Sequence, residues 1–347
     1  MNDRPFSVSA VIPAHDALPF VLEAVESVLA QRRPAEEIVV VDDGSSDGTG
    51  AAVEQRFADA HPAVRVVRGR FGSAAAARNA GWQAARSPWI AFLDADDLWF
   101  PDKLAAAEAA LDAVPSAGWF FSDGAFRTLT GELHHSWLAS YAELPEPYAG
   151  RPLAELLEVN FILTSSVVVR RDLLAATGGF DAKLSHAEDV DLWIRLARRA
   201  PATASRRSLV RYQHREGGLT RQLESRLLGD VALFGRLAGD RELAPPLRRR
   251  ARHRASLAHF KLGFAALRAG RGREARRAFG AAWLFPERAL PVAGAWLASW
   301  LPAAWLAGLR RQRWAVHGVA APALRQDRVA LRAEPALLPI SAPGGAS

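Results

Sequence analysis

An apolar run at residues 90–93 ends in two carboxylates that could bind a cation. Asp94 and Asp96 follow this run directly, and on an extended segment residues two apart point to the same side. Two like charges held this close repel each other unless a cation or hydroxyl groups lie between them. Carboxylate oxygens suit Mg or Mn, which take their remaining ligands from phosphates and water. The pair therefore predicts a site for a cation, a hydroxylated ligand, or both.

A second acidic pair ends the apolar run at residues 39–41. Asp42 and Asp43 are followed by a turn rich in glycine and serine, and then by a helical pattern. Capping of that helix explains Ser46 or Asp47, but it does not explain the pair. Acids at a strand end, without a basic partner nearby in sequence, are suited to accept hydrogen bonds from a ligand such as a nucleobase.

A third acidic group opens a helix near residue 187. Glu188, Asp189 and Asp191 precede the apolar residues Leu192 and Leu196, which supply a buried face. The helix dipole by itself favours acids in a first turn, so capping is an alternative to catalysis here. Asp189 and Asp191 are two apart and cannot share a helix face, but the spacing does not choose between them.

The elements that must position these acids alternate between strands and helices. Four βα units predict a mostly parallel sheet with helices on both faces. In such sheets ligands bind at the carboxyl ends of the strands, where the first two acidic pairs lie. We expect strands at residues 8–12, 37–41, 64–67 and 89–93, and helices at residues 18–31, 49–57, 73–85 and 101–111.

The rest of the chain divides into a less regular part and a helical part. Residues 118–121, 166–169 and 208–212 predict strands, and residues 187–199 predict a helix. From residue 222 the pattern is almost wholly helical, with a helical hairpin at residues 259–267 and 274–284. We expect domain boundaries that give 1–221 as the α/β domain, 222–318 as a helical, basic and Trp-rich region, and 319–347 as a disordered tail.

Several motifs in order resemble a family 2 glycosyltransferase with the GT-A fold. The resemblance covers about residues 7–215 and implies an α/β nucleotide-diphospho-sugar transferase fold, with a mostly parallel mixed sheet and a helical C-terminal extension. The motifs are residues 8–31, the turn at residues 42–49, Ala77-Arg78-Asn79-Ala80-Gly81, Asp94-Ala95-Asp96 with Pro101 behind it, and Gly178-Gly179-Phe180-Asp181 followed by Glu188-Asp189.

The resemblance implies a nucleotide pocket at the first two strands. Pro13 and His15 occupy positions that line the base pocket, and Asp43 matches the acid that hydrogen-bonds the base, with Asp42 beside it. Many relatives carry Tyr and Asn where this chain has His15 and Asp16, so the stacking contact differs. The donor expected from the resemblance is a nucleotide-diphosphate sugar, and a UDP-sugar is the leading candidate.

The resemblance also implies the roles of the reacting groups. Asp94 would contact the ribose or the donor sugar, and Asp96 would bind the Mn or Mg that bridges the diphosphate, with His214 as a nitrogen ligand. Asp189 matches the general base, and Arg78 a nucleotide-site residue. A carboxylate base is needed because a neutral sugar hydroxyl is a poor nucleophile. Metal charge on the diphosphate would stabilise the leaving group, giving one displacement with inversion.

Other classes fit the sequence less well. Residues 13–18 contain no glycine, so the Gly-x-Gly-x-x-Gly loop of a dinucleotide dehydrogenase and the Gly-rich basic loop of a sugar-nucleotide pyrophosphorylase are both missing. A non-catalytic helical scaffold that carries a degenerate transferase domain is the alternative that stays open. It predicts that nucleotide affinity does not depend on Asp96.

Composition separates an acidic front from a basic back. The 347 residues include no cysteine, which excludes a disulfide scaffold, a thiolate metal site and a cysteine nucleophile. Residues 1–197 hold 16 Lys and Arg against 28 Asp and Glu, a balance of −12, and residues 198–347 hold 28 against 9, a balance of +19. The acidic front suits a divalent cation, and the basic back suits an anionic surface or ligand.

The basic back contains 21 uncharged residues at 289–309, including Trp296, Trp300 and Trp305. A core helix hairpin, an interfacial membrane segment and a membrane span are the three alternatives. We expect peripheral association with the cytoplasmic face of a membrane, since residues 1–5 lack signal-peptide features. A saccharide or lipid-linked saccharide is the expected acceptor. Nucleic acid is not expected, because the arginines are not interleaved with a recognised binding motif.

Overall fold

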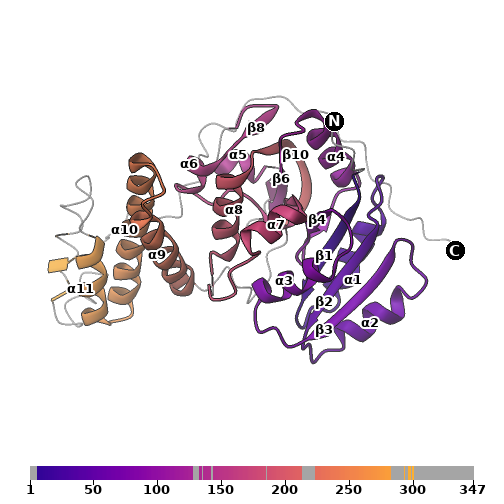
Figure 1. The fold of residues 1–347 in the computed structure, drawn as a ribbon. Coiled ribbons are helices and arrows are strands. Elements are labelled where there is room, and N and C mark those ends of the chain that lie inside the picture. The colour runs from indigo at the N-terminus through magenta and orange to yellow at the C-terminus, as the bar shows by residue number, and fades with distance from the viewer. Residues whose placement is uncertain are drawn as a thin grey trace.

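The computed structural model describes residues 6–127, 133, 134, 136–141, 144–184, 186–212, 223–282, 293, 296, 297, 299 and 300. Its centre is a 10-stranded mixed sheet with the main order β3-β2-β1-β4-β9-β6-β10-β5, flanked by helices (Figure 1). Strand β7 pairs with β6 at one side of this path, and β8 pairs with β10. The predicted α/β class, with a helical region after the sheet, is confirmed.

The first half of the sheet is parallel, as the four predicted βα units require. Strands β3, β2, β1 and β4 are neighbours in that order, so their carboxyl ends meet at one edge. Helix α4 begins at Lys103 rather than at residue 101. The elements are β1 (Val8–Ala14), α1 (Phe20–Leu29), β2 (Glu37–Asp43), α2 (Thr49–Arg56), β3 (Ala63–Gly69), α3 (Ala74–Ala84), β4 (Trp89–Phe92), β5 (Leu98–Trp99) and α4 (Lys103–Ala113).

The second half of the sheet mixes directions. Strand β9 runs antiparallel to β4 and β6, and β10 runs parallel to β6 but antiparallel to β5 and β8. Strand β10 begins at Ala202, earlier than the predicted residue 208. The elements are β6 (Trp119–Arg127), β7 (Leu133–His134), α5 (Leu138–Tyr141), β8 (Tyr148–Gly150), α6 (Leu153–Leu156), the 3-10 turn η1 (Thr164–Ser166), β9 (Val168–Arg170), α7 (Arg171–Thr177), α8 (Glu188–Arg199) and β10 (Ala202–Tyr212).

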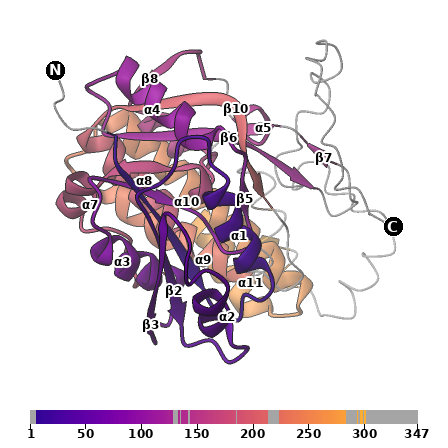
Figure 2. The same ribbon diagram turned by 90° about the vertical axis from the view of Figure 1, so that its right-hand side faces the viewer.

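Alternation along the strands produces two cores, one on each face of the sheet. Val39 and Val41 of β2 join one cluster with α3 and α8, whereas Ile38 and Val40 join the other with α1, α2 and α4. Successive side chains on a strand point to opposite faces, which explains this division. Figure 2 shows α3 on one side of β2 and β3, with α1 and α2 on the other. Burial on both faces explains why β2 is a continuous apolar run.

Three helices follow the sheet and extend away from it: α9 (Leu223–Gly239), α10 (Pro245–Arg268) and α11 (Gly272–Ala281). Helix α10 is far longer than the first arm of the predicted hairpin, and Pro245 stands where its missing N–H costs no helical hydrogen bond. Leu233 and Phe234 of α9 are buried in the same core as α8. Phe260 of α10 and Phe279 of α11 centre a separate small cluster.

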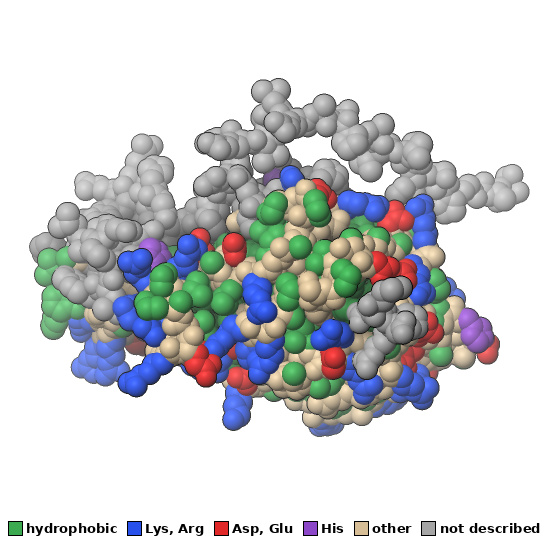
Figure 3. Space-filling model, turned by 45° about the horizontal axis from the view of Figure 1, so that its top comes forward, with side chains coloured by type: hydrophobic (Ala, Val, Ile, Leu, Met, Phe, Trp, Pro, Cys, Tyr) green, Lys and Arg blue, Asp and Glu red, His purple; other side chains and the backbone are tan. Residues whose placement is uncertain are grey.

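On the face of the molecule in Figure 3, charged side chains are spread out rather than gathered in one patch. Basic side chains recur across the face in Figure 3, singly and in small groups, with acidic ones between them. In the part of the chain that the structure describes, no helix is both long enough and apolar enough to cross a bilayer. Most of the 289–309 segment and all of the 319–347 tail lie outside the described residues, so the three alternatives for that segment stay open.

Candidate active site

The carboxyl ends of β1 and β2 bring His15 and Asp43 together. The Nδ1 atom of His15 lies 2.7 Å from the backbone oxygen of Asp43, and the imidazole is largely exposed. The Oδ1 atom of Asp43 accepts hydrogen bonds from the backbone N–H groups of Phe71 and of Gly72, the latter at 3.0 Å. Pro13 is buried on β1 in register with Val41. The loop after β3 thus holds the Asp43 carboxylate in place at the sheet edge.

Asp16 ties the loop after β1 to the loop after β2. Its Oδ1 atom accepts hydrogen bonds from the backbone N–H groups of Ser46 at 2.7 Å and Asp47 at 3.3 Å. The backbone bond from Ser46 is the main cause of the lowered pKa of Asp16. Asp47 in turn accepts from the N–H groups of Leu18 and Thr49, at 3.0 and 2.9 Å. These contacts fix the two loops that frame His15 and Asp43.

Asp42 does not share this surface with Asp43. Its side chain is buried, and its Oδ1 atom accepts the Ser45 N–H at 3.0 Å. A Cβ placed on Gly50 would lie 2.3 Å from Asp42 Oδ2, so the carboxylate packs against the start of α2. Adjacent residues of a strand point to opposite faces, which separates the two acids. In this structure Asp42 supports the turn, and its predicted part in the nucleotide pocket stays a prediction.

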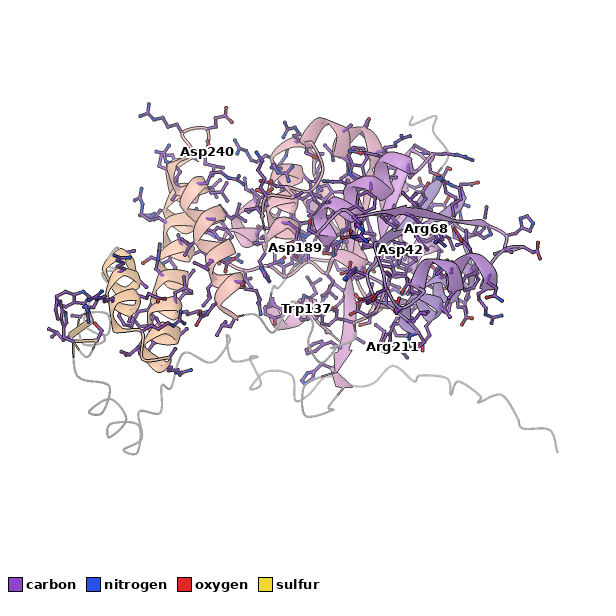
Figure 4. The ribbon with its side chains drawn as sticks, turned by 90° about the horizontal axis from the view of Figure 1, so that it is seen from below. Asp42, Arg68, Trp137, Asp189, Arg211 and Asp240 are labelled. Carbon is purple, nitrogen blue, oxygen red and sulfur yellow. The ribbon has the colours of Figure 1, made fainter. Side chains whose placement is uncertain are left out.

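Arg78 of α3 joins acids from two distant parts of the chain. Its guanidinium donates to Asp94 Oδ1 at 2.7 Å and to Glu188 Oε1 at 3.2 Å. Asp94 follows β4, and Glu188 opens α8, so this contact brings the first turn of α8 to the carboxyl edge of the sheet. We call Asp94, Glu188 and Asp189 with Arg78 the acidic cluster. Figure 4 places Asp189 between Asp42 and the C-terminal helices.

The Arg78 side chain is only 7% exposed, although an arginine on an alanine-rich helix is ordinarily solvated. Burial alone would lower its pKa, but the carboxylates of Asp94 and Glu188 outweigh burial and raise that pKa. The guanidinium lies 5.3 Å from the centre of the Phe180 ring, and its Nε atom has no hydrogen-bond partner in the described residues. Arg78 therefore stays charged and acts as the electrostatic centre of the cluster.

Asp189 is held by a residue from another segment. Asn160 donates from Nδ2 to Asp189 Oδ2 at 2.8 Å, and the Val190 N–H donates to Oδ1 at 2.6 Å. Burial raises the pKa of Asp189 above its ordinary value, against the lowering effect of these hydrogen bonds and of Arg78. Burial and the neighbouring charge of Asp189 also raise the pKa of Glu188. A carboxylate with a raised pKa is suited to accept a proton.

Asp191 lies on the opposite side of α8 and has a structural role. Its buried carboxylate is paired with Arg195 at 2.6 Å and with Arg236 of α9 at 2.5 Å. These pairs border a hollow of about 780 Å³ between α7, α8 and α9, which contains no member of the acidic cluster. The geometry thus separates Asp191, which fastens helices, from Asp189, which belongs to the cluster.

The segment after β4 presents one candidate metal ligand. Asp97 is buried and accepts the Ser165 hydroxyl at 2.5 Å, and the same hydroxyl accepts the Asp94 N–H at 3.0 Å. Asp96 lies between them and is partly exposed. One or two carboxylates with substrate phosphates suffice for Mg or Mn, so Asp96 fits a metal of this kind. The described residues hold no cluster of three metal-ligating side chains, and His214 lies outside them.

Three residues that form hydrogen bonds within the candidate site were not among the predicted site residues. Glu188 could have been found, because it adjoins Asp189 in the same motif. Asn160 and Ser165 carry no local signal, since an asparagine or serine in an irregular stretch is ordinary. Only the pairing of β9 with β4 and β6, which places residues 160–165 beside the carboxyl end of β4, reveals them.

Comparison with known proteins agrees with this arrangement. Residues 9–176 match the model of the family described as glycosyl transferase family 2. The succinoglycan biosynthesis protein ExoO of Rhizobium meliloti is 41% identical over 113 residues, which cover 32% of this chain and 32% of ExoO. The chain spans about a third of the length of the curated relatives that it matches, 30–32% for three of them.

Solved structures share the fold at low sequence identity. S. aureus TarS superposes with a TM-score of 0.63 at 16% identity, covering 89% of this chain and 93% of that one. The mannosyltransferase PcManGT of Pyrobaculum calidifontis gives a TM-score of 0.58 at 23% identity, covering 89% and 85%. Residues 9–176 therefore match glycosyl transferase family 2, and the chain has the GT-A fold that its motifs predicted.

Proposed function

We propose that this protein is an inverting, metal-dependent glycosyltransferase that moves a sugar from a nucleotide-diphosphate donor to a hydroxyl acceptor. The observation that carries the proposal is the bridge from Arg78 to Asp94 and Glu188, which seats Asp189 beside the carboxyl edge of the sheet. Ligands of open α/β sheets bind at that edge. A donor in this place has its anomeric carbon within reach of an acceptor activated by Asp189.

In this mechanism Asp189 accepts the proton of the acceptor hydroxyl while the oxygen forms a bond to the anomeric carbon. The bond from that carbon to the diphosphate oxygen breaks, and the electron pair leaves with the nucleoside diphosphate. Attack from the side opposite the leaving group inverts the configuration. Arg78 contributes by holding Asp94 toward the sugar or ribose hydroxyls and by offsetting the negative charge around Asp189.

The proposed nucleotide pocket lies at β1 and β2. In this proposal the exposed imidazole of His15 contacts the base, Asp43 hydrogen-bonds it, and the buried Pro13 lies beneath them; the contact between His15 and the Asp43 backbone supports it. Asp42 supports this pocket through its turn. TarS has been solved with UDP-GlcNAc and PcManGT with GDP-Man, so UDP-sugars and GDP-sugars are the donors to test.

The proposed metal is Mn or Mg, held by Asp96, with His214 as a further predicted ligand. PcManGT was solved with Mn²⁺, which supports a divalent ion in this fold. When bound, the ion supplies positive charge to the departing diphosphate. Its protein ligands would be few, because such ions take most of their coordination from phosphate and water.

The acceptor is proposed to be a saccharide or lipid-linked saccharide of a surface glycan. ExoO is a succinoglycan biosynthesis protein, and TuaG of Bacillus subtilis, 39% identical over 104 residues, is named for teichuronic acid biosynthesis. Work on such acceptors at the cytoplasmic face of a membrane would give the basic C-terminal region its role. The division into domains 1–221, 222–318 and 319–347 stays a prediction of the same kind.

The test is a screen of nucleoside-diphosphate release from UDP-sugars and GDP-sugars with Mn²⁺ or Mg²⁺. We expect one donor class to be turned over, with water as acceptor, and Asp96→Ala to weaken nucleotide binding in the presence of metal. Asp189→Asn should keep nucleotide binding and lose about 100-fold or more in rate. A wild-type protein that binds no nucleotide would instead support the non-catalytic scaffold.

A further inference from the structure

The stretch at residues 156–161, in which Leu156, Leu157 and Phe161 are buried, holds the proposed general base Asp189 through Asn160. Within it, the Asn160 amide donates to Asp189 Oδ2 at 2.8 Å. The Ile162 N–H approaches Asn160 Oδ1 at 3.4 Å, a contact that requires the oxygen on that side and the nitrogen toward Asp189. In this orientation the amide can only donate to Asp189, and a donated hydrogen bond is stronger to an ionised carboxylate than to a protonated carboxyl group.

This stretch is itself fixed at both ends. The Leu156 carbonyl accepts a hydrogen bond from Arg254 of α10 at 2.8 Å, and the Phe161 carbonyl accepts the indole N–H of Trp137 at 3.1 Å. Both carbonyls belong to buried residues, and the Arg254 side chain is 13% exposed. Asn160 therefore has little freedom to turn away from Asp189, and a fixed donor is what a positioned carboxylate needs.

The charges around Asp189 make such a donor useful. Asp94 and Glu188 are negative neighbours, and burial adds a further penalty on a charged carboxylate, whereas Arg78 and Arg254 are positive neighbours. A hydrogen bond from an amide favours the ionised form of a carboxyl group. Asn160 provides this bond without adding a charge that would pull the carboxylate away from the acceptor.

We propose that Asn160 is a positioning residue that orients the Asp189 carboxylate toward the acceptor hydroxyl and keeps it able to take a proton. The inference rests on the proposed function, since it needs Asp189 to be the general base. It adds a residue from outside the motifs that identify the family, and it explains why residues 156–161 are fastened to both α10 and Trp137.

The test measures the pH dependence of nucleoside-diphosphate release by the full-length protein, using the UDP- or GDP-sugar that the wild type turns over fastest in the screen above. The rate rises with pH as the base ionises, so its acidic limb reports the pKa of that base. Asn160→Ala should move this limb upward by about one pH unit and lower the rate at neutral pH by about tenfold. Asn160→Asp, which replaces the donor by a like charge, should lose more.

Two controls distinguish a positioning role of Asn160 from an effect of the substitution on folding. Nucleotide affinity should be unchanged in Asn160→Ala, because the Asn160 amide contacts the proposed general base Asp189 and not the nucleotide pocket. Asn79→Ala removes another asparagine with three hydrogen bonds, to Phe180 and Trp82, and should lower the melting temperature without moving the acidic limb.

Three results would overturn the positioning role of Asn160. An Asn160→Ala protein with the wild-type rate and the wild-type limb would overturn the positioning role, as would a lower rate with an unmoved limb. An Asn160→Asp protein as active as the wild type would do the same. If Asp189→Asn retains the wild-type rate, the base assignment itself fails, and that result is distinct from failure of Asn160 alone.

Discussion

Lys103 is a buried ionisable residue that has no part in the proposed chemistry. Its side chain is fully buried at the start of α4, and its Nζ atom has no hydrogen-bond partner in the described residues. The ammonium lies 4.9 Å from the centre of the Trp99 ring and 5.4 Å from that of Phe120. Burial lowers the pKa of Lys103 to about 7. An unpaired charge in such a place costs stability.

We predict that Lys103→Met stabilises the protein most in mildly acidic solution. The folded pKa lies near 7 and the unfolded one near 10.5, so between these values only the unfolded chain binds the proton, and wild-type stability rises with pH. The gain from Lys103→Met should be on the order of a few kcal/mol at about pH 6 and should fall toward zero at about pH 10. Urea unfolding across this range measures it.

The exposed Lys183 supplies the matched control for that experiment. Lys183→Met should change the free energy of unfolding by less than about 0.5 kcal/mol at every pH. A Lys103→Met gain that does not vary with pH would mean that the lysine is not neutralised by burial.

At the scale of elements, one buried arginine helps to fasten α10 to the α/β part of the chain, beside core contacts of Ala251 and Ala255. Arg254 donates to the Leu156 carbonyl, lies 3.5 Å from Asp230 of α9, and stacks 4.0 Å from the centre of the Phe234 ring. Together these contacts join α10 to α9 and to the stretch that holds Asp189. The helical region is thus packed against the proposed site rather than tethered to it.

We predict that Arg254→Met destabilises the protein by about 2 kcal/mol, because it leaves the buried Leu156 carbonyl without its donor and removes the partner of the partly exposed Asp230. Chemical unfolding measures the change. Arg252→Met on the same helix, at an exposed position, should stay within about 0.5 kcal/mol of the wild type. Equal effects of the two substitutions would show that Arg254 does not fasten the helix.

At the scale of the whole molecule, the opposed charges of the two parts predict a preferred location. Residues 1–197 have a balance of −12 and residues 198–347 a balance of +19, of which +13 lies in residues 222–347, the helical region and the tail. Leu223, Leu228, Leu297 and Trp300 add exposed apolar side chains to the same region. Basic and apolar side chains together suit the surface of an anionic bilayer.

We predict that the full-length protein sediments with vesicles of phosphatidylcholine and phosphatidylglycerol at low salt, and much less with phosphatidylcholine alone. High salt should release it, because exposed charges are screened over about 10 Å or less at physiological ionic strength. A chain ended after residue 282 should bind more weakly. Binding that ignores both lipid charge and salt would contradict an electrostatic attachment.

The sequence by itself determined what depends on local pattern. Short apolar runs located β2, which ends in Asp43, and β4, which Asp94 follows, and motif order identified the family before any contact was known. The resemblance also chose Asp189 over Asp191 as the general base, and this choice stays a prediction. In the structure Asp191 is paired with Arg195 and Arg236.

Only the tertiary structure decided what depends on long-range contact. Arg78 and Glu188 lie 110 residues apart, and Asn160 and Asp189 lie 29 apart, so no local pattern links them. The same is true of Asp42, which matches its neighbour in type but faces its own turn because side chains alternate across a strand. Periodicity reports which face a residue occupies, whereas the charge and partners of a buried group follow from what the fold packs against it.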